Sequence, residues 1–189
     1  MIRTLLGHPD RLKPNPVYRS AAPARLYETD RGIAAEGLES FAVLRDKAER
    51  RSRAALRAAD RRRAETLARV DGVSLSVPVV EWDVLARRAV AHRNRRDEER
   101  AGDRFDRLPT PARVADVDEP TLQRWMVNYL RHVLTVYDAE SDELFGRVGR
   151  IQGTRRLRQR VYAAIALAYP ELAGECRRQL QEREGEDFS

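Results

Sequence analysis

The sequence predicts a mainly α-helical protein with one long basic helix, a C-terminal unit of three helices and a short extended element. Two observations predict this fold class. Apolar residues recur at spacings of three and four along much of the chain, which is the period of an α-helix. Glycine and proline are concentrated in a few short segments, where they would end helices. Only residues 73–79 and the segment 25–27 have the character of strands.

The composition limits the class of protein. The 189 residues can bury a core, but charged residues make up 35% of the chain and aromatic residues only 6%, which predicts a modest one. Cys176 is the only cysteine, so an internal disulfide and a cysteine-rich zinc cluster are both excluded. The first ten residues lack the apolar core of a signal peptide, and no run approaches the ~18 apolar residues of a membrane span. We therefore expect a cytoplasmic protein that does not bind membranes.

The N-terminal half is expected to contain an arm, a long helix and a short strand. Residues 1–29 are rich in proline and turn-forming residues, which predicts an extended arm with a short strand near residues 25–27. A long helix is expected over about residues 41–70, ending at Gly72. The alternation of apolar residues over 73–79 predicts a half-buried segment, which Pro78 makes either an edge strand or a short extended clamp. A helix is expected to follow from Asp83 to about Arg96.

The second half is expected to form a separate domain. Residues 97–120 are rich in proline and charge and poor in large apolar residues, so they are a candidate linker between domains 1–96 and 121–189. Beyond the linker, apolar residues at helical spacing predict three helices. The breaks between them are expected near Gly146 and Gly149 and at Pro170.

Positive charge is concentrated in the predicted long helix. From residue 45 to residue 69 there are ten basic and four acidic residues, and ten minus four gives +6, the net charge of the whole chain. Most of these basic residues fall within half of the helix circumference, opposite a thin apolar seam. The planar guanidinium of arginine pairs with two phosphate oxygens at once. We therefore predict that this helix binds the backbone of nucleic acid, DNA in the first place, through Lys47, Arg50, Arg51, Arg53, Arg57, Arg61, Arg62 and Arg69.

Two other interpretations of the basic helix remain open. It could be a solvated helix whose acidic residues pair internally, since Glu49 can reach Arg53 at helical spacing. It could also be the helix of an adaptor or scaffold protein that binds a protein partner through the apolar seam of Phe41, Ala48 and Ala55.

A family resemblance supports the nucleic-acid interpretation. The segment Lys13-Pro14-Asn15-Pro16, then Ala24-Arg25-Leu26-Tyr27, then the basic helix resembles the DNA-binding region of the xeroderma pigmentosum group A family, which are scaffold proteins of nucleotide excision repair. The resemblance covers about residues 13–70. It implies DNA binding by the helix, and Arg25 joins the expected binding residues. The zinc module of that family has no counterpart here. Residues 121–180 resemble an uncharacterised group of bacterial proteins, which implies no activity.

The sequence has no pattern that indicates catalysis. Its three histidines, His8, His92 and His132, are far apart and form no metal-binding pair. A glycine-rich phosphate loop and a nucleophile elbow are both missing from the sequence. Cys176 falls on an apolar stripe and is expected to be a packing residue. We therefore expect no enzyme activity, no metal and no cofactor.

Overall fold

The computed structural model describes residues 2–15, 17–18, 20–102 and 110–186. The fold is mainly α-helical, which confirms the predicted fold class. The chain divides into two compact units, Met1–Asp60 and Arg61–Ser189. The division falls within the long helix α3 (Glu39–Asp71), whose bounds agree closely with the expected helix.

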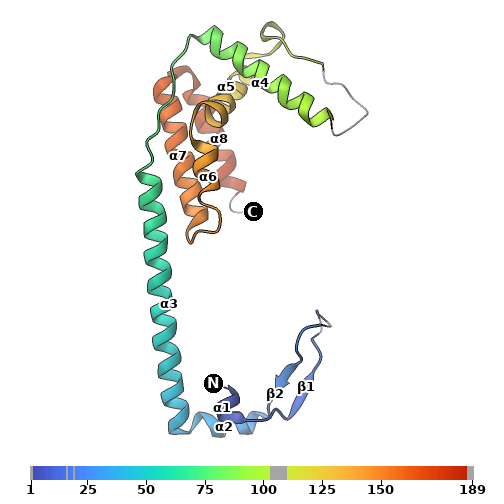
Figure 1. Cartoon of the computed structure of the whole chain (residues 1–189), viewed down its shortest axis with the longest axis vertical. Helices are drawn as coiled ribbons and strands as arrows, with labels where there is room; N and C mark the ends of the chain where they lie inside the picture. Colours follow the sequence, from blue (N-terminus) through green and yellow to red (C-terminus); the bar gives the residue numbers. More distant parts are fainter. Residues whose placement is uncertain (1, 16, 19, 103–109, 187–189) are drawn as a thin grey trace. The chain divides into compact units, whose positions relative to one another are not determined.

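The first unit consists of several short elements and the N-terminal part of the long helix (Figure 1). Its elements are α1 (Ile2–Leu6), β1 (Arg11–Lys13), β2 (Ala24–Leu26), α2 (Thr29–Glu36) and residues 39–60 of α3. The two strands form an antiparallel hairpin in which Leu12 lies opposite Arg25. Because neighbouring residues of a strand point to opposite faces, Leu12 and Arg25 share one face of the hairpin, and Arg11 and Lys13 lie on the other.

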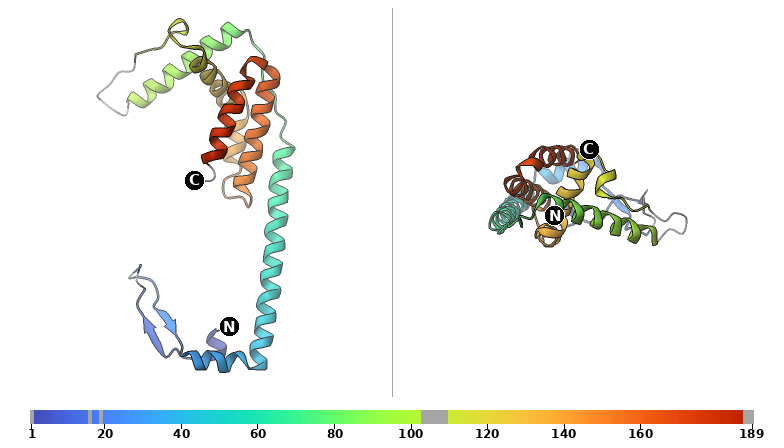
Figure 2. Two further views of the ribbon diagram at one scale, coloured as in Figure 1. Left: turned by 180° about the vertical axis from the view of Figure 1, so that it is seen from behind. Right: turned by 90° about the horizontal axis from the view of Figure 1, so that it is seen from above.

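The second unit is helical and contains the main core (Figures 1 and 2). Its elements are residues 61–71 of α3, α4 (Trp82–Gly102), η1 (Val114–Asp116), α5 (Glu119–Tyr129), the π-helical turn η2 (Leu130–Leu134), α6 (Tyr137–Asp142), α7 (Arg150–Ala168), η3 (Pro170–Leu172) and α8 (Ala173–Glu186). Leu157, Val161 and Ile165, one helical turn apart on α7, are fully buried. They belong to one core cluster with Leu85 of α4 and Met126 of α5.

The expected strand over residues 73–79 is extended but does not pair into a sheet. Its alternation is real, because Val73, Leu75 and Val77 are half-buried while the residues between them are exposed. Side chains bind this part of the backbone instead of a second strand. The hydroxyl of Tyr169 donates to the carbonyl of Pro78 at 3.0 Å and accepts from the N–H of Val80 at 2.9 Å. The edge-strand alternative was therefore wrong, because burial of every second residue does not require pairing in a sheet, and the extended-clamp alternative describes the segment.

The expected linker over residues 97–120 does not separate two domains. Helix α4 continues to Gly102, and residues 103–109 lie outside the described residues. The Asn94 side chain donates to the carbonyl of Ala112 at 3.0 Å and accepts from its N–H at 2.9 Å. Helices α4 and α5, on the two sides of the segment, pack together in the second unit. The predicted boundary was wrong because proline and charge report local exposure, not whether the flanking helices share a core.

Candidate nucleic-acid interface

Helix α3, which Figure 1 shows as a ribbon, carries exposed basic side chains in each of the two units. Those in the first unit are Lys47, Arg50, Arg51, Arg53 and Arg57, and those in the second are Arg61 and Arg62; all seven are exposed. Within the described part of the chain, all but Arg53 are without a carboxylate partner closer than 4.0 Å. These guanidinium and ammonium groups are therefore accessible to anions from solution.

The ion pairs of Glu49 on the same helix neutralise little of this charge. Glu49 lies 3.9 Å from Arg45 and 3.8 Å from Arg53, so the pair expected at helical spacing is present. All three side chains are more than half exposed, and exposed pairs of this kind contribute about 0.5 kcal/mol or less. An anion could displace Glu49 from Arg53 at low cost.

Arg69 differs from the other predicted binding residues. It is half-buried, and its Nη2 lies 3.2 Å from Glu140 and 3.8 Å from Glu143. Its Nη1 is buried and has no hydrogen-bond partner among the described residues. Arg69 therefore contacts the segment around α6 instead of solvent. The spacing of arginines along α3 could not show this, because the covering residues are about seventy positions away in the sequence.

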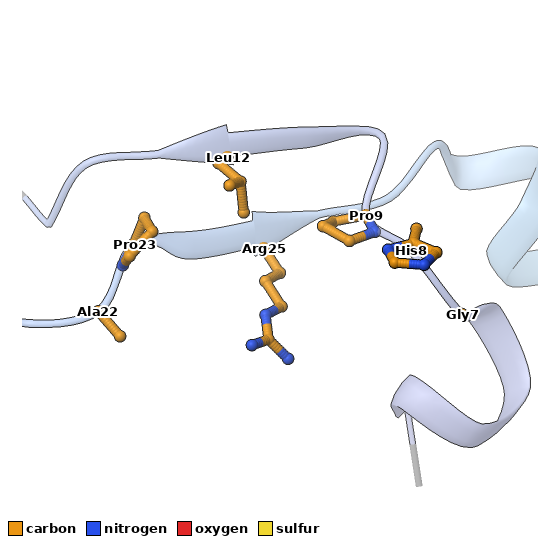
Figure 3. A pocket seen from close by; sticks show the side chains of 7 residues that line it. All are labelled: Gly7, His8, Pro9, Leu12, Ala22, Pro23 and Arg25. Atoms are coloured by element: carbon orange, nitrogen blue, oxygen red, sulfur yellow. The ribbon is translucent and has the colours of Figure 1, made fainter.

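Arg25 lies on the hairpin of the first unit, not on α3. Its side chain is exposed and belongs to the face that carries Leu12. The wall of a concavity of about 480 Å³ includes both residues together with His8 (Figure 3). Sequence reasoning named Arg25 but did not find this concavity, because the register that brings residues 12 and 25 together cannot be read from either segment alone.

A buried polar network in the second unit also escaped sequence reasoning. Arg131, in the π-helical turn η2, is only 5% exposed. Its guanidinium lies over the rings of Tyr137 and Tyr162, at 5.3 and 5.4 Å from their centroids, and donates to the Tyr162 hydroxyl. That hydroxyl donates to Gln179 at 2.8 Å, and Gln179 donates to Glu175 at 2.7 Å. The network joins η2, α7 and α8.

In the second unit, Cys176 is buried and His132 is held by hydrogen bonds. Burial raises the pKa of the Cys176 thiol to about 12, so this thiol is protonated at neutral pH. His132 accepts from Arg131 through Nε2 at 3.0 Å and contacts Asp138 through Nδ1 at 2.7 Å. In the described ranges, histidine, cysteine and carboxylate side chains form no group that could hold a metal ion.

Comparison of the chain with family models, with curated proteins and with solved structures found no match in any of the three. Among the helices that the structure describes, none combines the length and the apolar character needed to cross a bilayer.

Proposed function

We propose that this chain is a non-catalytic nucleic-acid-binding protein. Its ligand is the sugar–phosphate backbone, with DNA as the preferred nucleic acid, and it binds on the basic face of α3. The observation that carries the proposal is the set of exposed basic side chains on α3, all of which except Arg53 have no carboxylate partner in the described structure. A concentration of positive charge with free guanidinium groups is the electrostatic pattern that phosphates bind.

The spacing of these residues suits a phosphate backbone. Arg50, Arg53 and Arg57 lie within about 60° of one another around the helix, so their side chains leave the same face. Their Cα atoms span about 10 Å along the axis at 1.5 Å per residue. Duplex DNA carries about six phosphate charges over that distance. One duplex can therefore meet all three side chains without deformation.

The chemistry of this face supports binding without catalysis. Arginine stays protonated at any physiological pH, so it holds an anion but neither accepts nor delivers a proton. Nucleophilic or acid–base chemistry would have to come from other groups. Cys176 is buried and protonated, and both ring nitrogens of His132 are engaged.

The proposal is tested by removing charge from this face. We expect the triple variant Arg50→Gln/Arg53→Gln/Arg57→Gln to bind duplex DNA at least tenfold more weakly than the unmodified chain at ~50 mM salt, because three phosphate contacts are lost. Glutamine keeps a high helix propensity, so circular dichroism should be unchanged. Fluorescence anisotropy with labelled duplex DNA, single-stranded DNA and RNA gives the affinities and shows which nucleic acid is preferred.

A matched control separates a local site from net charge. Arg87, Arg88 and Arg95 on α4 are exposed, and no carboxylate of the described structure lies within 4.0 Å of them. Changing these three to glutamine removes the same charge from another helix. Equal losses of affinity in the two triple variants would contradict a specific role of α3.

The uncovered apolar seam of α3 favours a second candidate, a helical adaptor for a protein partner. Ala48 and Ala55 are exposed and Phe41 is half-buried in the first unit. Under this alternative, Ala48→Glu/Ala55→Glu abolishes partner binding and the unmodified chain has negligible affinity for nucleic acid. Under the proposed function, DNA lies on the opposite face, and the same variant keeps most of its affinity.

A further inference from the structure

The hairpin of the first unit has a hollowed face. The concavity measures about 480 Å³ and is lined by His8, Pro9, Leu12, Ala22, Pro23 and Arg25. Figure 3 shows Leu12 and Arg25 in the middle of the hairpin, with His8 and Pro9 toward one end and Ala22 and Pro23 toward the other. Its volume lies within the range of about 300–1,000 Å³ that small-molecule sites occupy.

Two sets of contacts place these side chains around one space. The strand register puts Leu12 opposite Arg25, so both belong to the same face. The turn that leads into the hairpin is fixed on both sides of His8: the Tyr27 hydroxyl donates to the carbonyl of Gly7 at 3.3 Å, and Arg31 donates to the carbonyl of His8 at 3.4 Å. Hydrogen bonds from these two side chains to backbone carbonyls thus hold His8 beside the hairpin.

Among the described residues that line the concavity, only Arg25 has a side chain that is always charged. The acidic residue of the adjoining turn, Asp10, is engaged elsewhere. It accepts from the N–H of Glu28 at 2.9 Å and from the Arg31 guanidinium. These hydrogen bonds, that of Glu28 first, outweigh desolvation and hold the pKa of Asp10 below its usual value. Within the described residues, no carboxylate lies within 4.0 Å of Arg25.

The lining therefore combines one free guanidinium with an imidazole and an apolar wall. A guanidinium pairs with a phosphate, while leucine and proline side chains and an imidazole ring pack against the flat face of a base. We propose that this concavity binds a phosphorylated nucleotide at the end of a nucleic-acid strand, with Arg25 on the phosphate and the base against Leu12 and Pro23. This inference rests on the proposed function, which it extends from backbone contact to recognition of a strand end.

The test uses the full chain and three small probes: 5′-phosphorylated dithymidine dinucleotide, the same dinucleotide without the 5′-phosphate, and thymidine monophosphate. Isothermal titration calorimetry gives their affinities. We expect loss of the phosphate to weaken binding of the dinucleotide about tenfold, which is the usual effect of one charge-assisted hydrogen bond. Tighter binding of thymidine monophosphate than of the phosphorylated dinucleotide would contradict a strand end as the ligand and indicate a free nucleotide.

Variants of the hairpin locate the site. Arg25→Gln should lose about tenfold in affinity for the phosphorylated dinucleotide, and Arg25→Lys should recover part of it because the charge returns. Arg11 is the matched control, since it lies on the opposite face of the same hairpin. Arg11→Gln should change the affinity by less than about twofold. Equal effects of Arg25→Gln and Arg11→Gln, or no effect of the 5′-phosphate, would overturn the proposal.

The outcome is separable from that of the proposed function. The α3 triple variant should bind the phosphorylated dinucleotide as well as the unmodified chain does, because its substitutions lie on another element. If the chain binds duplex DNA through α3 but not the dinucleotide, only the strand-end inference fails. The chain could also bind the dinucleotide through Arg25 and fail to bind DNA or RNA of greater length. That result would contradict the role of α3, and it would also contradict a strand end as the ligand of the hairpin.

Discussion

Gly146 and Gly149 lie in the turn between α6 and α7, and both have positive φ angles, +73° and +87°. This backbone conformation is unfavourable for residues with a Cβ atom by about 1–2 kcal/mol. The surroundings of the two glycines differ. A Cβ atom at Gly146 would meet nothing within 4 Å, whereas one at Gly149 would lie 2.9 Å from Cγ of Arg63. Of these two glycines, therefore, only Gly149 lies against α3.

This difference predicts unequal effects of alanine at the two positions. Gly146→Ala should lower the free energy of unfolding by about 1 kcal/mol, from backbone conformation only. Gly149→Ala should lower it by about 2–4 kcal/mol, because Arg63 and the turn must also move apart. Chemical denaturation of both variants measures these values. Equal destabilisation would show that the turn does not pack on α3 as described.

At the scale of elements, the π-helical turn η2 places His132 between Arg131 and Asp138. Because arginine only donates, Nε2 of His132 must accept, and Nδ1 of the neutral ring then carries the proton and donates to Asp138. Burial, and next the charge of Arg131, lower the pKa of His132 below its ordinary value of 6.5; Asp138 opposes this shift, and Arg96 adds to it. Protonation of Nε2 would break the hydrogen bond from Arg131.

The sign of the resulting pH dependence follows from this shift. A histidine whose pKa is lowered in the folded state stabilises the fold fully above pH 6.5, and this stabilisation is lost as the pH falls through the folded pKa. We expect the free energy of unfolding to decline below pH 6.5, and less steeply in His132→Asn. His92 is shifted in the same direction, by burial first, and should account for part of the remaining decline. An NMR titration that gives His132 a pKa above 6.5 would contradict this geometry.

Elements with a strong local signal could be predicted from the sequence, and those that depend on distant residues could not. The bounds of α3 follow from its helical composition and from the Asp71-Gly72 stop. The extended segment after it could not be distinguished from a strand, because its backbone partner is the Tyr169 hydroxyl, about ninety positions away. Likewise, the packing of α4 on α5 depends on tertiary contacts that the composition of residues 97–120 does not report.

The candidate site divides in the same way. The exposure of Arg50, Arg57 and their neighbours follows from a helix that carries many charges and little apolar surface. The ion pairs of Arg69 and the concavity beside Arg25 depend on residues brought near by folding. Both arginines were therefore predicted to bind nucleic acid, although Arg69 is ion-paired and Arg25 is exposed.

One segment accounts for the net positive charge of the entire chain. The segment from residue 45 to residue 69 carries ten basic and four acidic residues, a difference of +6, and the remaining charges of the chain sum to zero. Binding driven by this segment must release counterions from the nucleic acid. It must therefore weaken steeply with salt, by about 0.9 in log affinity per unit of log salt concentration for each duplex phosphate contacted.

The most direct test of charge-driven DNA binding by α3 is its salt dependence. The affinity for duplex DNA is measured between ~50 and ~200 mM salt for the unmodified chain and for Arg50→Gln/Arg53→Gln/Arg57→Gln. We expect a steep slope for the unmodified chain and a slope smaller by about 2.7 for the variant, since three contacts are removed. A variant slope equal to that of the unmodified chain, or no measurable binding of either protein at ~50 mM salt, would contradict nucleic-acid binding by α3.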